Sequence, residues 1–548
     1  MIKYYAKDYG IMPNMDASKG LIKLFNDLQK ASENKEVIFE KGTYYINSKN
    51  CEKHSMYVTN TVGNNEYKKG EERHNVPVPF YLENTKNLVI NGNDSTFIMN
   101  GKCTSMAFIN CENIVLENLE LTHLHPDIHE LKVVSKSPFS VEFLADKNTI
   151  IENEKGKLYF NGEGYHAPIT ADSKFAWWNA YIDAKTPDKI VRYRHPLGDA
   201  FGIKYLGDNH IKAHYLNTAR FKLNDRYYIF NNRRDFVGIF VDRCKNFEIK
   251  NVKQRVSYSL ALVCQNSENI LVDSVEFAPK DEDFKMSSVA DFIQLCMCRG
   301  DIIVKDSYFD GAGDDLLNVH GMHFEIVKRD ENKLTVAFKH PQSHGYNAFR
   351  VGDKIAYIDK DSMLEKDTST ITSSKLVNED EIEITVDKLG DFVIGDVVEN
   401  IDACPNLLFK NNKSTRIITR GLLITTRGKV VIENNDFKST SMSGILLSDD
   451  AKSWYESGMC KNVTIKDNKF HYCAQTPVLI KPENSVHKGA VHTNITIENN
   501  EFDSYDNECI NAKSSSNITV KNNTFVSDNI VKYKNCENVV VEDNKVLN

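Results

Sequence analysis

Three aspartates in the middle of the chain have the spacing of a sugar-cleaving site. Asp314 and Asp315 follow Gly313 in a glycine-rich segment, and Asp291 precedes Asp314 by 23 residues. That interval equals the period of a repeat that recurs along the chain, so we expect Asp291 and Asp314 at nearly equivalent positions of adjacent coils. Mutual repulsion raises the pKa of at least one such carboxyl. Inverting glycoside hydrolysis needs this division, because one acid protonates the leaving oxygen while a carboxylate about 6.5 to 9.5 Å away activates water.

Two other interpretations of these residues remain. Gly-Asp-Asp is ordinary turn chemistry, so Asp314 and Asp315 would then be turn residues. The match to Asp291, with Asn318 and His320 a few residues further on, favours a site instead. A calcium cluster is the second alternative, but His320 and the apolar neighbours make a cage of hard oxygen ligands less natural. The twelve cysteines show no paired Cys-x-x-Cys pattern, and we expect no metal and no other cofactor.

The aspartates lie within a repeated pattern: an initial Asn or similar residue, alternating apolar and polar residues, and a closing large apolar residue. Clear copies begin at Asn269, Asp301, Lys429, Asn462, Asn494 and Asn517. Intervals of 23 residues recur, and others extend to 32 or 33. Leucine-rich repeats share this period, but their consensus is absent, and β-branched residues favour strands. The sequence therefore predicts an all-β protein, a right-handed parallel β-helix or solenoid.

The solenoid is predicted to be capped and interrupted. Residues 16 to 31 form an amphipathic helix that covers its open end, with Asp16 or Ser18 placed to cap it. Two intervals lack the repeat and contain short alternating strands, which predict two small β-barrel-like insertions. The predicted parts are an N-terminal cap with first coils, an inserted barrel, central coils with the aspartates, a second barrel and C-terminal coils, at 1–127, 128–232, 233–321, 322–402 and 403–548.

Composition limits the partners. The 548 residues carry a net charge of −8 without a compensating basic tract, which argues against nucleic acid or an anionic membrane as partner. No apolar run approaches the roughly 20 residues that span a bilayer, and the first residues lack the pattern of a signal peptide. We therefore expect no membrane segment and a cytoplasmic location, or secretion if a leader has been removed. The oligomeric state is left open by the sequence.

Several motifs together are similar to glycoside hydrolase family 110, whose members are exo-acting α-1,3-galactosidases. The motifs are Ala290 to Gly300, Asp314 to Gly321, His340 to Gly345, Arg416, Arg420 with Gly421, Leu423 to Gly428 and Trp454 to Gly458. The resemblance spans nearly the whole chain. It implies a β-helix with two β-barrel insertions that releases terminal α-galactose with inversion and without a metal. Asp291, Asp314 and Asp315 match the family's acidic positions, whereas Gln294 stands where the family's pattern has His, which bears on substrate preference.

The roles of the aspartates are assigned by analogy with polygalacturonases, another inverting β-helix family with three aspartates. On this hypothesis Asp314 is the general acid, and Asp291 with Asp315 holds the attacking water. Asp314→Asn should then abolish hydrolysis of a natural disaccharide. It should spare more activity on an aryl galactoside, whose leaving group needs no proton.

Substrate binding should involve further polar and aromatic side chains. Galactose requires groups that read its hydroxyls and an apolar platform, which Glu456 and Trp454 offer, although Trp454 could instead be a packing residue. Arg416 and Arg420 reach the sugar or brace the ends of the coils. The candidate binding residues are Asn318, His320, Arg416, Arg420, Trp454 and Glu456.

The sequence thus predicts an exo-acting inverting glycoside hydrolase whose partner is a glycan with terminal α-1,3-linked galactose, either of blood-group-B type or linear Galα1-3Gal. Two alternatives stay open. A β-helix hydrolase of a uronate polysaccharide would have a basic cleft. A noncatalytic carbohydrate-binding solenoid would show no turnover and would keep its binding when the acids are neutralised.

Overall fold

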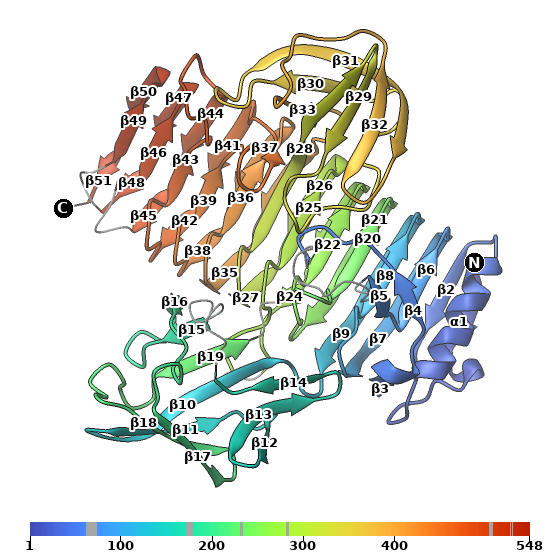
Figure 1. Ribbon diagram of the computed structural model, residues 1–548, viewed down its shortest axis with the longest axis vertical. Helices are drawn as coiled ribbons and strands as arrows, with labels where there is room; N and C mark the ends of the chain where they lie inside the picture. Colours follow the sequence, from blue (N-terminus) through green and yellow to red (C-terminus); the bar gives the residue numbers. More distant parts are fainter. Residues whose placement is uncertain are drawn as a thin grey trace.

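The body of the protein is a right-handed parallel β-helix (Figure 1). The computed structural model describes residues 1–61, 74–170, 179–230, 234–280, 284–503, 508–526, 528 and 530–547. Helix α1 (Ser18–Lys30) covers the N-terminal end, where Phe25 packs edge-on against Phe80 of the first coils at 5.4 Å between ring centroids. The Asp16 carboxylate accepts the Ser18 N–H at 3.0 Å at the start of this helix. Among the described residues, no helix has both the length and the apolar character that a membrane crossing needs.

Three ladders of parallel strands form the coils. One of them consists of short strands, which include β27 (Tyr308–Ala312), β35 (Lys413–Ile417), β38 (Asp436–Lys438), β42 (Lys469–His471), β45 (Glu501–Asp503) and β48 (Thr524–Phe525). The predicted repeats form strands of the larger ladder, which include β23 (Glu268–Asp273), β26 (Arg299–Lys305), β37 (Lys429–Glu433), β41 (Asn462–Lys466), β44 (His492–Glu498) and β47 (Ser515–Lys521). The second ladder contains β20 (Ile239–Asp242), β22 (Leu262–Gln265), β25 (Ile293–Cys296), β28 (Leu317–Asp330), β36 (Leu422–Thr425), β39 (Ile445–Leu447) and β43 (Val478–Ile480). The predicted catalytic aspartates lie at the second ladder.

The closing aromatic residue of the repeat forms a continuous stack inside the C-terminal coils. Phe437, Phe470, Phe502 and Phe525 follow one another with ring centroids 5.2, 4.9 and 4.9 Å apart. Parallel strands place equivalent residues of successive coils about 4.8 Å apart, which is the spacing of stacked rings. The repeat therefore places the same aromatic side chain at four successive levels of the core.

An inward-facing asparagine of the repeat forms a row of hydrogen-bonded side chains, here called the asparagine ladder. The Asn435 amide donates to Asn468 Oδ1 at 2.9 Å, Asn468 donates to Asn500 Oδ1 at 3.0 Å, and Asn500 donates to Asn523 Oδ1 at 3.0 Å. All four side chains are buried. Each amide group is satisfied by the coils above and below, so the ladder ties neighbouring coils together at the turn.

Replacing one member of this ladder should destabilise the helix. Asn468→Ala would remove the buried Oδ1 atom that accepts the backbone N–H and the side-chain amide of Asn435, and the amide that donates to the Ile432 carbonyl oxygen. We expect a loss of about 1 to 3 kcal/mol, measured from the shift of the urea unfolding midpoint. Lys469→Ala on the same coil is the control, because the ion pair of Lys469 with Glu501, at 3.7 Å, is exposed and should contribute little. Equal losses in the two variants would contradict the role of the ladder.

The first insertion consists of antiparallel strands between β10 (Ile128–Ser137) and β19 (Arg226–Phe230). Seven of them form a sheet in the order β16, β15, β19, β10, β11, β18 and β17, and a separate sheet contains β12, β13 and β14. Their bounds are β11 (Ser140–Ala145), β12 (Ile150–Glu154), β13 (Lys157–Gly162), β14 (Tyr165–Pro168), β15 (Asn179–Ile182), β16 (Val191–Tyr193), β17 (Gly202–Gly207) and β18 (His210–His214). In the described part, β16 and β17 are edge strands, so this insertion is an open sheet and not a closed barrel.

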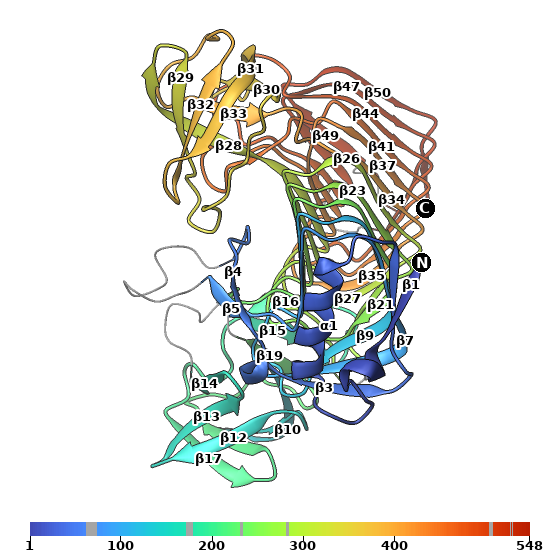
Figure 2. The same cartoon turned by 90° about the vertical axis from the view of Figure 1, so that its right-hand side faces the viewer.

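The second insertion is a closed six-stranded barrel. Its first strand is the distal half of β28, which runs out of the coil without a break, and the others are β29 (Lys333–Ala337), β30 (Lys354–Ile358), β31 (Glu365–Leu376), β32 (Glu381–Val386) and β33 (Val397–Asn400). The pairing of β33 with β28 closes the ring. Figures 1 and 2 show the two insertions as lobes on one flank of the β-helix, with the hairpin of β4 (Lys53–Ser55) and β5 (Asn75–Pro77) between them.

Candidate active site

The structure brings the three predicted aspartates together at the entry to the second ladder. One carboxylate oxygen of each lies within 4.8 Å of those of the other two. Strand pairing matches Ile293 with Leu317, an offset of 24 residues. Asp315, and not Asp314, is therefore the equivalent of Asp291 on the next coil, because this coil is one residue longer than the 23-residue period. Asp314 is the residue directly before Asp315, and its side chain joins the cluster from that position.

Two of the three carboxylates are held by guanidinium groups. Arg234 Nη2 donates to Asp314 at 2.5 Å, and Arg192 Nη2 lies 3.4 Å from the other oxygen of Asp314. Asp315 accepts hydrogen bonds from Arg420 Nε at 2.8 Å and from the Thr419 hydroxyl at 2.5 Å, and Arg420 Nη2 lies 2.8 Å from its second oxygen. Because these oxygens already bind cations, they are poorly suited to a divalent metal ion, which needs the same lone pairs.

Asp291 has a different environment. It is almost fully buried, and its hydrogen bonds come from neutral donors, the Asn60 amide at 3.4 Å and the Asp315 backbone N–H at 3.2 Å. Burial, together with the charges of Asp314 and Asp315, raises the pKa of Asp291 well above its ordinary value. Burial acts in the same direction on Asp314, but Arg234 and Arg192 keep the pKa of that carboxyl below its ordinary value. The two pKa values are thus shifted in opposite directions, which favours the protonated form of Asp291 over that of Asp314.

A pocket of about 430 Å³ opens beside the aspartates, a size typical of small-molecule sites. Of the residues predicted from sequence, seven line it: Asp291, Asp314, Asp315, Asn318, Arg420, Trp454 and Glu456. Its floor follows one outward-facing position of the second ladder, where Asn318, Leu423 and Leu446 lie on successive coils. A polar surface near the aspartates thus passes into an apolar one, as a sugar with one hydroxyl-rich and one C–H face requires.

His320 lies behind the pocket lining. Its Nε2 is 3.7 Å from Glu456 Oε1, and Glu456 Oε1 accepts the Asn318 amide at 2.9 Å. The His320 Nδ1 is 2.6 Å from the Gly321 carbonyl oxygen, and its Nε2 is 2.7 Å from the Gln294 amide nitrogen. His320 therefore lies between Gln294 and Glu456, and neither His320 nor Gln294 lines the pocket. Gln294, the departure from the family's pattern, is buried and does not line the pocket.

Arg416 also lies outside the pocket. Its Nη2 pairs with Asp310, and its Nη1 is 3.7 Å from Asp188 of the first insertion. Of the two roles considered for Arg416, the structure supports the one in which it braces the coil, here against the inserted sheet. Arg420 lines the pocket and binds Asp315, so it stays a candidate for binding the sugar.

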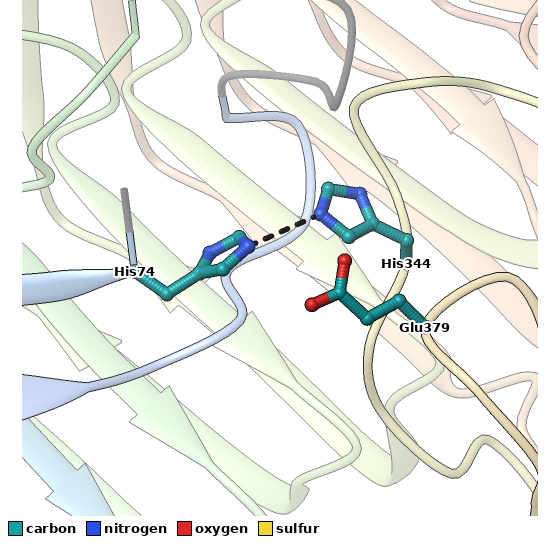
Figure 3. Close-up of side chains that lie close together, drawn as sticks. All are labelled: His74, His344 and Glu379. Atoms are coloured by element: carbon teal, nitrogen blue, oxygen red, sulfur yellow. Dashed lines mark hydrogen bonds between the residues drawn. The ribbon is translucent and has the colours of Figure 1, made fainter. Parts of the chain in front are cut away.

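Two further clusters in the described residues bring histidine and carboxylate groups to the spacing of metal ligands. One contains His74, His344 and Glu379 (Figure 3), and the other contains Glu152, Glu154 and His166. Both lie apart from the residues that line the pocket. The catalytic cluster is thus not the part of the structure best suited to a transition metal.

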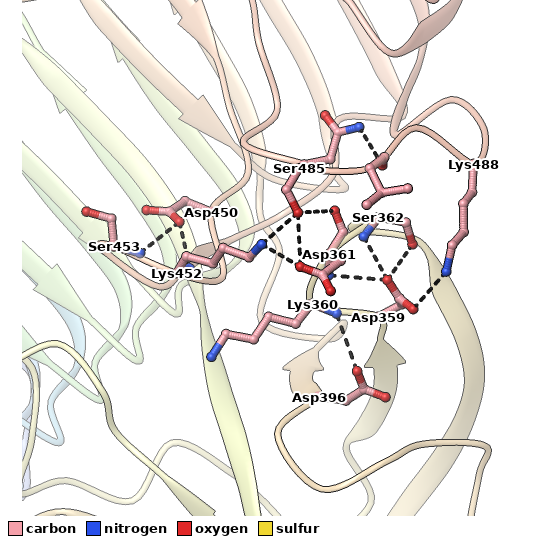
Figure 4. Close-up of polar contacts among 12 residues, drawn as sticks. Asp359, Lys360, Asp361, Ser362, Asp396, Asp450, Lys452, Ser453, Ser485 and Lys488 are labelled. Atoms are coloured by element: carbon pink, nitrogen blue, oxygen red, sulfur yellow. Dashed lines mark hydrogen bonds and ion pairs between the residues drawn. The ribbon is translucent and has the colours of Figure 1, made fainter.

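The loop that carries Trp454 is held by Asp450 and by the second barrel. The Asp450 carboxylate accepts the backbone N–H groups of Lys452 at 2.8 Å, Ser453 at 3.0 Å and Trp454 at 2.7 Å. Figure 4 shows Lys452 extending to Asp361 of the β30–β31 turn, where its Nζ is 2.6 Å from Asp361 Oδ1. The Trp454 ring stacks on His340 at 4.3 Å and is 43% exposed, so it presents an aromatic face at the rim of the pocket.

Trp454→Ala should weaken substrate binding more than catalysis. We expect KM to rise by roughly tenfold, equivalent to the loss of about 1.4 kcal/mol of contact, with a smaller change in kcat. Steady-state kinetics on the disaccharide would measure both. Trp454→Phe, which retains a ring, is the matched control and should recover most of the loss. A fall in kcat alone would contradict a platform role.

Sequence reasoning missed three residues of the site: Asn60, Arg192 and Arg234. Arg234 lies just after the first insertion, Arg192 lies inside it, and Asn60 lies in the segment after β4. None occupies a position of the repeat, so its periodicity carried no signal for them. The Arg234 side chain also bonds Asn60 Oδ1 at 2.6 Å, which joins the two segments around the aspartates.

Comparison with known proteins agrees with this architecture. Residues 333–398 match the family model of the GLAA-B beta-barrel domain II, and residues 398–548 match that of the right handed beta helix region. The chain is 32% identical to alpha-1,3-galactosidase A of Bacteroides thetaiotaomicron, covering 95% of this chain and 93% of that protein. It is 32% identical to alpha-1,3-galactosidase A of Akkermansia muciniphila, with 82% and 75% covered, and 29% identical to that of Bacteroides fragilis, with 95% and 87% covered. With this identity extending over cap, coils and both insertions, the chain belongs to the alpha-1,3-galactosidase family.

Proposed function

We propose that this protein is an exo-acting α-1,3-galactosidase that hydrolyses the terminal α-linked galactose of a glycan with inversion at the anomeric carbon. The observation that carries the proposal is the 32% identity over 93% of the Bacteroides thetaiotaomicron enzyme. The geometry supports it, because the three aspartates line one pocket together with Asn318, Arg420 and Trp454.

Asp291 is the group best placed to donate the proton. A general acid must hold its proton at the working pH, and Asp291 is the carboxyl whose pKa is raised. The analogy with polygalacturonases assigns this role to Asp314 instead. Arg234 and Arg192 favour the ionised form of Asp314, so the electrostatics of the site oppose that assignment.

Asp314 and Asp315 would then hold and activate the water. Each is bound to a guanidinium group, which weakens it as a direct nucleophile towards carbon. The closest oxygens of the three aspartates are within 4.8 Å, which is less than the about 6.5 to 9.5 Å of the usual inverting pair and nearer to the about 5 to 5.5 Å of retaining enzymes. Inversion is therefore proposed from the family resemblance and from the pairing of Asp314 and Asp315 with guanidinium groups. It is not proposed from the distance between the carboxylates.

The composition of the pocket disfavours a uronate polymer as substrate. Six carboxylate side chains line it, against three basic ones, Arg234, Arg420 and Lys452. Two of these bases are already paired with Asp314 and Asp315. The net negative charge of the pocket would repel an anionic polysaccharide, whereas it would not repel a neutral galactoside.

Proton NMR of the released galactose tests the proposal. The purified protein would be incubated with Galα1-3Gal, with the fucosylated branched trisaccharide and, as a control, with polygalacturonate. We expect the β-anomer of galactose to appear first from at least one of the two galactosides, since inversion of an α-linkage yields β-galactose. First appearance of α-galactose would contradict inversion. No release from either galactoside would contradict the activity itself.

A further inference from the structure

We propose that His74, His344 and Glu379 form a binding site for one divalent transition-metal ion of the zinc class, outside the catalytic pocket. Figure 3 shows the two imidazole rings and the carboxylate turned towards one another. One ligand atom of each lies within 4.8 Å of the other two. The residues come from three separate segments: His74 directly precedes β5, His344 lies between β29 and β30, and Glu379 lies in the β31–β32 turn.

The distance between the imidazoles matches that of two ligands on one metal. His74 Nε2 and His344 Nε2 are 3.4 Å apart. Two nitrogens at 2.0 to 2.1 Å from a tetrahedral zinc ion lie about 3.3 to 3.4 Å from each other. A direct hydrogen bond between the rings would usually be shorter, about 2.9 to 3.0 Å. Two histidines and one carboxylate are a donor set that zinc and similar ions prefer over calcium or magnesium.

Neighbouring groups orient the three ligands. The Tyr57 hydroxyl donates to Glu379 Oε1 at 2.7 Å. The Tyr57 ring packs on His74 with 4.0 Å between centroids and meets His344 edge-on at 5.8 Å. A Cβ at Gly345 would lie 1.9 Å from Tyr57 Cδ1, so this close approach requires glycine beside His344. Hydrogen-bonded and packed partners of this kind are what fixes the ligands in metal sites.

The site lies where the N-terminal segment meets the second barrel. From Tyr57 the chain continues to Thr59, whose hydroxyl is 3.0 Å from that of Ser343, and to Asn60, which donates to Asp291. A bound ion would link this segment to the barrel through His344 and Glu379. We therefore assign the ion a structural role, in which it stabilises the contact between the N-terminal hairpin and the barrel, and no role in the hydrolytic step.

Calorimetric titration of ZnCl₂ into untagged, chelator-treated protein tests the site. The wild-type protein should bind about one ion here, and its Tm should rise with zinc because the ion binds the folded state. His344→Ala should lose both the binding and the rise in Tm. Glu379→Gln, which is nearly isosteric, provides a second variant that should lose affinity at least about tenfold even if His344→Ala folds poorly.

The control is His166→Ala in the cluster with Glu152 and Glu154. That His166 is exposed and 3.5 Å from Glu154, so its cluster offers the same ligand types without a buried, oriented site. The His166→Ala variant should bind zinc like the wild type. Absence of zinc binding by the wild type would overturn the proposal. So would retention of wild-type affinity in both His344→Ala and Glu379→Gln, or loss of the ion in His166→Ala alone.

Discussion

Asp291→Asn is expected to lower kcat/KM on Galα1-3Gal by about 10²- to 10⁴-fold, the usual contribution of a general acid. The loss should be much smaller on an aryl α-galactoside with an acidic phenol as leaving group, because that bond breaks without protonation. The physical reason is the burial of Asp291 beside Asp314 and Asp315, which raises the pKa of Asp291 and so favours its protonated form. Steady-state kinetics on the two substrates would measure the difference.

Asp314→Asn is the matched variant. If Asp314 holds the water and not the proton, its loss should be similar on both substrates, since attack by water is needed in each case. The reverse pattern, with aryl galactoside activity spared in Asp314→Asn and lost in Asp291→Asn, would restore the assignment made by analogy with polygalacturonases. The two variants differ from wild type by one oxygen-to-nitrogen exchange each, so their geometry is comparable.

Thermal stability shows whether Asp291→Asn remains folded. The folded-state pKa of Asp291 is raised above its unfolded value. The wild type therefore loses stability as pH rises from the ordinary aspartate range through the raised pKa. The asparagine variant lacks this loss, so its Tm relative to wild type should increase with pH over that window. A variant Tm that falls relative to wild type as pH rises would contradict the charge distribution described for the cluster.

Arg234→Gln should cause the second-largest loss of kcat/KM. Removing the guanidinium leaves Asp314 buried with only the longer contact to Arg192, and breaking a buried pair costs on the order of 3 to 5 kcal/mol. Arg234 lowers the pKa of both Asp314 and Asp291. Without it both values rise, so both limbs of the pH profile of kcat/KM should move to higher pH. We expect a fall in kcat/KM of at least about 10²-fold near neutral pH.

Arg416→Gln is the control for this result. Arg416 is equally buried in the coil and pairs with Asp310 and Asp188, but it does not line the pocket. It should lower Tm while leaving both limbs of the pH profile in place. Arg234→Lys, which keeps a positive charge, should shift the two limbs of the pH profile less than Arg234→Gln does. An unchanged acid limb in Arg234→Gln would show that the guanidinium does not control the ionisation of Asp314.

The sequence alone determined the parallel β-helix and the meeting of the three aspartates, because both follow from a local period. A repeat that places Phe437, Phe470 and Phe502 in one stack must also bring acids one period apart onto neighbouring coils. The same period misplaced the register by one residue, since the coil from Ile293 to Leu317 has 24 residues and pairs Asp291 with Asp315. The register between these two strands depends on the hydrogen bonds of that individual coil, and not on the average length of the repeat.

Only the tertiary structure distinguished the environments of the aspartates. The ionised form of Asp314 is favoured because Arg234 and Arg192 reach it from the boundary and the interior of an insertion whose sequence has no fixed relation to the coils. The exclusion of His320 and Arg416 from the pocket likewise depends on how side chains turn after the backbone is placed. A periodic pattern specifies which backbone positions lie above one another. Charge, burial and proton affinity depend on contacts between side chains from segments far apart in the chain. The repeat does not predict those contacts.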